Sequence, residues 1–86
     1  MKESLGTIVV VDDDQNVGLL VSVVLKNLNY NVISLTCGTE LLEYLSKHHK
    51  PLLILLDIRL PDIDGYEICR RIRENPLFSD IPIIIL

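Results

Sequence analysis

Three runs of the sequence are almost entirely apolar, and they restrict the fold more than any other feature. They are Thr7–Val11, Leu52–Leu56 and Pro82–Leu86. Unbroken apolar runs of this length are typical of strands buried on both faces, whereas strands with one wet face alternate apolar and polar residues. A weaker run with β-branched residues, Asn31–Leu35, adds a fourth strand. The four runs predict a parallel sheet covered by helices.

The segments between these strands have the residue spacing of helices. The first carries one apolar stripe at helical period, formed by Val17, Leu20, Val21, Val24, Leu25 and Leu28. A second helix is predicted over Thr39–Lys47, ending near His48-His49 because Pro51 disfavours helix at the residue before it. In the third segment, Asp64-Gly65 starts a helix whose inward face is predicted to be Ile68, Cys69 and Ile72.

The resulting order, β-α-β-α-β-α-β, predicts an α/β fold with a doubly wound parallel sheet and right-handed crossovers. With 86 residues, of which 49% are hydrophobic, the chain has room for a single small domain. The last run, Pro82–Leu86, needs cover on both sides. We therefore expect residues 1–86 to form one domain that is incomplete at its C-terminus.

Charge and cysteine content narrow the class of protein. A net charge of −4 disfavours direct binding to nucleic acid, because that affinity comes largely from Lys and Arg neutralising phosphates. The sequence has neither a signal-peptide core nor an apolar run of membrane-spanning length. Cys37 and Cys69 match no metal-ligand spacing and are expected to be reduced thiols. These features indicate a cytoplasmic protein without a membrane segment.

Aspartates follow two of the buried strands. Asp12-Asp13-Asp14 comes directly after the first strand, and Asp57 ends the third. Parallel strands end at the same edge of a sheet, so these carboxylates are expected to share an acidic pocket. Their repulsion would be relieved by a hard divalent cation, for which Mg²⁺ is the natural choice. A bare acidic triplet would more simply be a solvated turn, but Asp57 at the end of an apolar strand is a much rarer arrangement.

Two motifs resemble the receiver domain of bacterial two-component response regulators, a flavodoxin-like fold. They are Val9–Asp14 and Asp57–Gly65, and the resemblance covers essentially the whole chain. It implies a regulatory switch rather than an enzyme, in which Asp57 accepts a phosphoryl group from a histidine kinase or phosphotransfer protein. It also implies that Asp13 binds Mg²⁺ directly, that Asp12 binds it directly or through water, and that the backbone carbonyl of Arg59 is a further ligand. Asp14 would cap the first helix.

The family's domain continues beyond the fourth strand into two more helices and a fifth strand. By the family's pattern, a switch Thr or Ser and a phosphate-binding lysine would both follow Leu86. The lysines of this chain are Lys2, Lys26, Lys47 and Lys50, and none ends a predicted strand. The resemblance is therefore to a receiver domain truncated after its fourth strand.

Two other functions remain open from the sequence. The spacing Asp12-x-Asp14 after a buried strand also resembles the nucleophile motif of haloacid-dehalogenase-type phosphatases. That motif expects Thr or Val two residues after the second aspartate, where this chain has Asn16. Alternatively, the chain is a non-catalytic interaction fragment whose exposed last strand, Ile83–Leu86, pairs with a second copy to form a homodimer.

Overall fold

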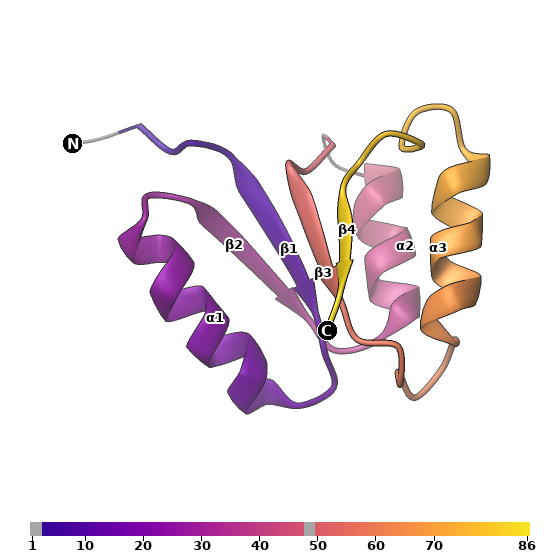
Figure 1. Cartoon of the computed structure of the whole chain (residues 1–86), viewed down its shortest axis with the longest axis horizontal. Helices are drawn as coiled ribbons and strands as arrows, with labels where there is room; N and C mark the ends of the chain where they lie inside the picture. Colours follow the sequence, from indigo (N-terminus) through magenta and orange to yellow (C-terminus); the bar gives the residue numbers. More distant parts are fainter. Residues whose placement is uncertain (1–2, 48–49) are drawn as a thin grey trace.

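The computed structural model describes residues 3–47 and 50–86 and contains one sheet with helices on both faces (Figure 1). The elements are β1 (Thr7–Val11), α1 (Gln15–Asn27), β2 (Asn31–Leu35), α2 (Gly38–Lys47), β3 (Leu53–Leu56), α3 (Gly65–Glu74) and β4 (Ile83–Ile85). The sheet order is β2-β1-β3-β4 and every pairing is parallel. The predicted element order and parallel sheet are confirmed. None of the described helices is long and apolar enough to cross a bilayer.

The element boundaries differ from the sequence prediction by about one residue at strand ends. β3 begins at Leu53 rather than Leu52, and β4 is Ile83–Ile85 rather than Pro82–Leu86. The backbone hydrogen bonds nevertheless extend further, since Leu86 donates to the Leu56 carbonyl at 2.9 Å. The hydrogen-bond ladder of β4 therefore covers the predicted run, because Ile54 also donates to the Pro82 carbonyl at 3.0 Å. The predicted end of the second helix, at His48-His49, lies outside the described residues.

The main core lies between the sheet and the pair α2 and α3, which cover the same face (Figure 1). It consists of Val9, Val11, Leu41, Leu45, Ile54, Leu56, Ile68, Ile72 and Ile81. The predicted inward face of the third helix is confirmed, because Ile68 and Ile72 are buried and Cys69 packs against them partly buried. All four strands contribute to this core, β1 and β3 with buried side chains and β2 and β4 with partly buried ones that pack against them, so burial here holds the sheet to α2 and α3.

The packing of α1 differs from the expectation set by its apolar stripe. The helix is confirmed, but Leu20, Val24 and Leu28 on the stripe are 52–67% exposed. The residues that α1 buries are Gly18 and Ser22. A Cβ atom on Gly18 would lie 2.4 Å from the Ser34 hydroxyl of β2, so the small residue permits a close approach to that strand. The stripe is therefore confirmed only in part: Val17, Val21 and Leu25 are partly buried beside Gly18 and Ser22, and the other half of the stripe is exposed.

This packing predicts that matched substitutions in neighbouring strands differ in cost. Ile54 in β3 is fully buried, whereas Ile84 in β4 is 51% exposed. Ile54→Ala should lower the free energy of unfolding by about 3 kcal/mol, because it removes buried contacts and leaves a cavity. Ile84→Ala should lower it by less than about 1 kcal/mol. Urea unfolding followed by circular dichroism measures both, and equal losses would contradict this difference in burial.

Candidate functional site

The backbone ladder continues one residue past the strands and fixes two aspartates at the carboxyl edge of the sheet. Val11 of β1 is in register with Leu56 of β3. Beyond them, the Asp57 N–H donates to the Val11 carbonyl at 2.9 Å, and the Asp12 N–H donates to the Leu35 carbonyl of β2 at 3.0 Å. Asp12 and Asp57 therefore leave adjacent strands side by side, at the edge where doubly wound sheets bind ligands.

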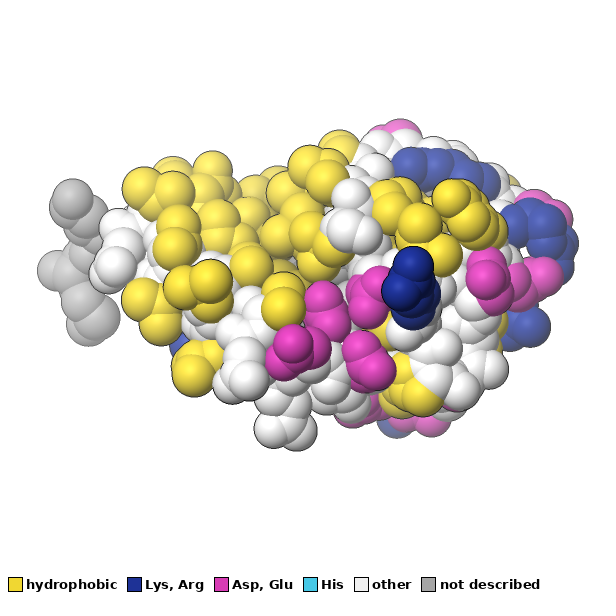
Figure 2. All heavy atoms as spheres, turned by 60° about the horizontal axis from the view of Figure 1, so that its bottom comes forward, with side chains coloured by type: hydrophobic (Ala, Val, Ile, Leu, Met, Phe, Trp, Pro, Cys, Tyr) yellow, Lys and Arg dark blue, Asp and Glu magenta, His cyan; other side chains and the backbone are white. Residues whose placement is uncertain are grey.

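Three carboxylates meet at this edge. Asp12, Asp13 and Asp57 each offer an oxygen, and these oxygens all lie within 4.8 Å of one another. Asp12 is only 8% exposed, Asp57 is half-buried and Asp13 is exposed. They line an open cleft of about 650 Å³ together with Asp14, Val17, Ile58, Arg59, Tyr66 and Leu86. Figure 2 shows acidic side chains gathered on this side of the molecule.

The buried position of Asp12 makes its negative charge unfavourable. Burial raises the pKa of its carboxyl above the ordinary value, and the hydrogen bond from the Asp14 N–H, at 2.8 Å, opposes that rise. The neighbouring carboxylates of Asp57, Asp13 and Asp14 raise the same pKa further. A cation bound among these oxygens would relieve both effects.

Asp14 has a different role from its neighbours. Its carboxylate accepts a hydrogen bond from the Asn16 N–H at 2.9 Å and caps α1, as predicted from the resemblance. Asp14 is also outside the three-carboxylate group. A phosphatase of the haloacid-dehalogenase type would need Asp14 at the reacting centre, so this position favours the receiver interpretation.

The loop after Asp57 folds tightly against the site. The Asp57 carboxylate accepts from the Arg59 N–H at 3.0 Å, and the Gly65 N–H closes the loop by donating to the Ile58 carbonyl at 2.9 Å. A Cβ atom on Gly65 would lie 2.6 Å from Ile58 Cα, so only glycine fits at this approach. Asp64 then caps α3 through the Tyr66 N–H at 2.8 Å, as predicted.

The sequence interpretation gave Asp62 no function of its own, yet its carboxylate binds the first turn of α2. The only sequence signal was indirect. Cys37, directly before α2, is not one of the oxygen-bearing residues that cap helices well. An acceptor from elsewhere in the chain was therefore needed.

The parallel sheet, the helices on both faces and the carboxylates at its edge define a doubly wound α/β protein with an acidic site. Residues 8–86 match the family model of the response regulator receiver domain, and the chain belongs to that family. The predicted flavodoxin-like receiver fold is thereby confirmed.

Individual relatives agree with this assignment. The chain is 38% identical over 79 residues to the alkaline phosphatase synthesis transcriptional regulatory protein PhoP of Bacillus subtilis, covering 92% of this chain and 32% of PhoP. It is similar to the N-terminal domain of a response regulator receiver protein from Methanoculleus marisnigri, with a TM-score of 0.88, 38% identity and coverage of 95% and 66% of the two chains. It is also similar to a phosphorylated cyanobacterial phytochrome response regulator, RcpA, with a TM-score of 0.86, 30% identity and coverage of 93% and 63%. The chain thus spans about a third of the length of the curated relatives it matches.

The carboxylate geometry predicts that removing one charge stabilises the protein when divalent ions are absent. Asp12→Asn keeps an oxygen that can accept from the Asp14 N–H but removes the buried charge. We expect its free energy of unfolding at neutral pH, in chelator, to exceed that of the wild type by roughly 1 kcal/mol. Chemical denaturation with EDTA present is the measurement.

The advantage of Asp12→Asn should depend on pH. Folding raises the pKa of Asp12, so the ionised carboxylate destabilises the folded protein. This destabilisation is complete above the folded-state pKa and fades as the pH falls toward the pKa of Asp12 in the unfolded chain. The difference between the two proteins should therefore shrink in acid. Glu43 is an exposed residue of α2 that lies away from the cleft. Glu43→Gln removes its charge and should not raise the free energy of unfolding comparably. A wild type more stable than Asp12→Asn in chelator would contradict the repulsion.

Proposed function

We propose that this chain is the phosphoacceptor part of a signalling switch, in which Asp57 receives a phosphoryl group from a histidine kinase or a phosphotransfer protein. The observation that carries the proposal is the position of the half-buried Asp57 carboxylate beside those of Asp12 and Asp13, in a cleft open to solvent. Membership of the receiver family and similarity to a phosphorylated response regulator support it.

The carboxylate of Asp57 is the nucleophile in this proposal. Its Oδ1 atom is held by the Arg59 N–H, which orients the group and leaves Oδ2 to attack phosphorus. The Oδ2–P bond forms as the P–N bond to the donor imidazole breaks. The imidazole nitrogen departs with the bonding electron pair, and the product on Asp57 is an acyl phosphate. Release of phosphate by water regenerates the carboxylate.

The three carboxylates fit Mg²⁺, because this ion prefers oxygen ligands and their oxygens lie within 4.8 Å of one another. We propose that Asp13 and Asp57 hold the ion directly, that Asp12 holds it directly or through water, and that the Arg59 backbone carbonyl, in the same cleft, is a further ligand. Bound Mg²⁺ would neutralise the charge between the carboxylates and the incoming phosphoryl group. Asp12 and Asp13 thus allow an anion to approach an anionic site.

Phosphorylation should be specific to Asp57. We expect incubation with Mg²⁺ and a small-molecule phosphodonor to add one phosphate, located on Asp57 by intact mass and peptide mapping. Asp57→Asn should abolish the addition, and EDTA should reduce it strongly. Asp14→Asn is the matched control and should be phosphorylated like the wild type. Asparagine also caps helices, and Asp14 lies outside the carboxylate group. Phosphate on Asp57→Asn at the wild-type level would contradict the proposal.

A second proposal concerns self-association through β4. Within residues 3–47 and 50–86, this strand is the last in the sheet order and its one strand partner is β3, and Ile84, Ile85 and Leu86 are exposed. An apolar strand with an open edge is a template for pairing with another chain. We propose that two copies of the chain pair along this edge. The proposal is independent of phosphorylation.

Light scattering tests the pairing. The mass of the wild-type chain should rise from monomer toward dimer with concentration, and Ile84→Lys should prevent the rise because a charge blocks edge pairing. Leu77→Lys, in the exposed connection before β4, is the control and should dimerise like the wild type. A strictly monomeric wild type at high concentration would contradict the proposal.

A further inference from the structure

The N-terminus of α2 lacks a capping oxygen from the residue that precedes it. The helix begins at Gly38, and Cys37, just before it, offers only a weakly accepting sulfur. Glu40 reaches back to Thr36, accepting from its N–H at 3.0 Å and from its hydroxyl at 2.8 Å. The amides of Gly38 and Thr39, in the first turn, therefore need an acceptor from outside the helix.

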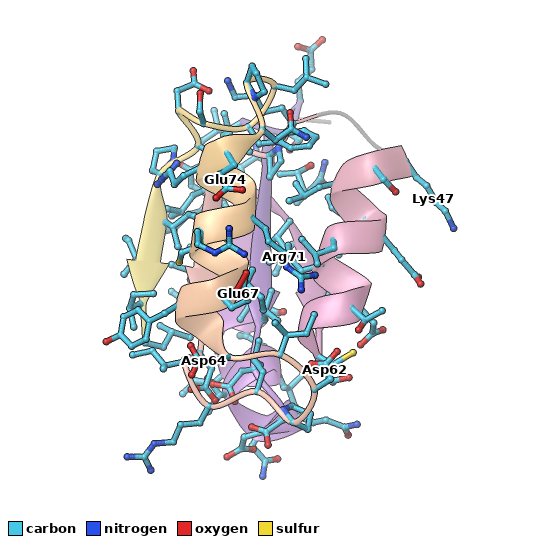
Figure 3. The ribbon with its side chains drawn as sticks, turned by 90° about the vertical axis from the view of Figure 1, so that its right-hand side faces the viewer. Lys47, Asp62, Asp64, Glu67, Arg71 and Glu74 are labelled. Atoms are coloured by element: carbon cyan, nitrogen blue, oxygen red, sulfur yellow. The ribbon has the colours of Figure 1, made fainter. Side chains whose placement is uncertain are left out.

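Asp62 supplies that acceptor from the loop between β3 and α3. The Gly38 N–H donates to its Oδ1 at 2.8 Å, and the Thr39 N–H donates to its Oδ2 at 2.8 Å. The Thr39 hydroxyl also donates to Oδ2. Figure 3 shows Asp62 at the start of α2. These bonds hold the pKa of Asp62 far below its ordinary value, so the carboxylate faces the helix N-terminus with its full negative charge.

Close packing supports the same junction independently of the hydrogen bonds. A Cβ atom on Gly38 would lie 2.4 Å from Ile68 Cδ1 and 3.2 Å from Ile63 Cβ. The start of α2 thus rests directly on the residue after Asp62 and on the first turn of α3. Because the space admits only glycine without a shift of these side chains, a displacement of the loop is expected to displace the start of α2.

The loop that carries Asp62 is the loop that begins at Asp57. The Asp57 carboxylate accepts from the Arg59 N–H, and the same loop is closed at Gly65 by the Ile58 carbonyl. Asp62 adds an internal bond, accepting from the Ile63 N–H at 2.9 Å. One short loop therefore lines the acidic cleft with Asp57 and contacts the N-terminus of α2 with Asp62.

We propose that Asp62 is a positioning residue that couples the acidic cleft to α2. Occupation of the Asp57 carboxylate shifts the loop, and Asp62 carries the shift to the first turn of α2. In the opposite direction, α2 holds the loop in the conformation that favours cation binding, because coupling between two sites is reciprocal. The inference rests on the proposed function, since it concerns the response to a cation at Asp12, Asp13 and Asp57.

An NMR titration of the isotopically labelled chain with MgCl₂ tests this coupling. In the wild type, the amide signals of Gly38 and Thr39 should shift with the same midpoint as those of Asp13 and Asp57. In Asp62→Ala, the signals of Asp13 and Asp57 should still shift, those of Gly38 and Thr39 should not, and the midpoint should rise about fivefold. Glu40→Ala is the matched control, because it removes a cap from the same helix end without touching the loop, and it should keep the wild-type response.

The outcomes separate this inference from the proposed function. No response of Asp13 and Asp57 in the wild type would overturn both. If the amide signals of Gly38 and Thr39 still shift on Mg²⁺ addition in Asp62→Ala as they do in the wild type, the coupling alone is overturned. It is also overturned if Glu40→Ala loses the response of these two signals as completely as Asp62→Ala does. If Asp62→Ala does not fold, Asp62→Asn replaces it, because the amide keeps one accepting oxygen and loses the second. It should show a reduced response, and a wild-type response would overturn the coupling.

Discussion

The parallel pairing of β1 with β3 is the constraint on which the site depends. Its register places Val11 opposite Leu56, and one further backbone hydrogen bond holds Asp57 beside Asp12. The carboxylates gain nothing from this arrangement by themselves, since they repel one another and one of them is buried. The apolar side chains on the α2 and α3 face provide the burial that keeps the strands in register. The acidic cleft thus exists because the packing of the sheet holds mutually repelling carboxylates together.

Most of the fold could be predicted from the sequence because apolar strands and helical spacing are local signals. The grouping of Asp12, Asp13 and Asp57 was also predictable, since each follows the end of a parallel strand. The buried face of α1 was predictable only in part, because half of its apolar stripe is exposed. Periodicity shows which residues share a face, but the Gly18 contact with Ser34 depends on how two elements meet. The bonds of Asp62 to α2 were equally hidden, because they span 23 and 24 residues.

The two faces of the sheet are stabilised unequally. Among the described residues, nine buried apolar side chains form the core that the sheet shares with α2 and α3, whereas α1 leaves Leu19, Leu20 and Val23 exposed. Figure 2 shows the resulting hydrophobic side chains on the surface beside the acidic ones. The acidic site lies at the carboxyl ends of β1 and β3, the two central strands, which separate these two faces. Receiver-family relatives of known structure are longer than this chain, which covers 66% of one and 63% of another.

The capping of α2 has a consequence for the order of folding. Asp64 and Asp14 each cap the helix that directly follows them, so α3 and α1 can begin as soon as their own residues are in place. The first turn of α2 must wait for an acceptor that lies 24 residues further along the chain. Closing that long loop costs entropy before the hydrogen bonds form. We therefore expect the first turn of α2 to gain its cap later in folding than the first turns of α1 and α3.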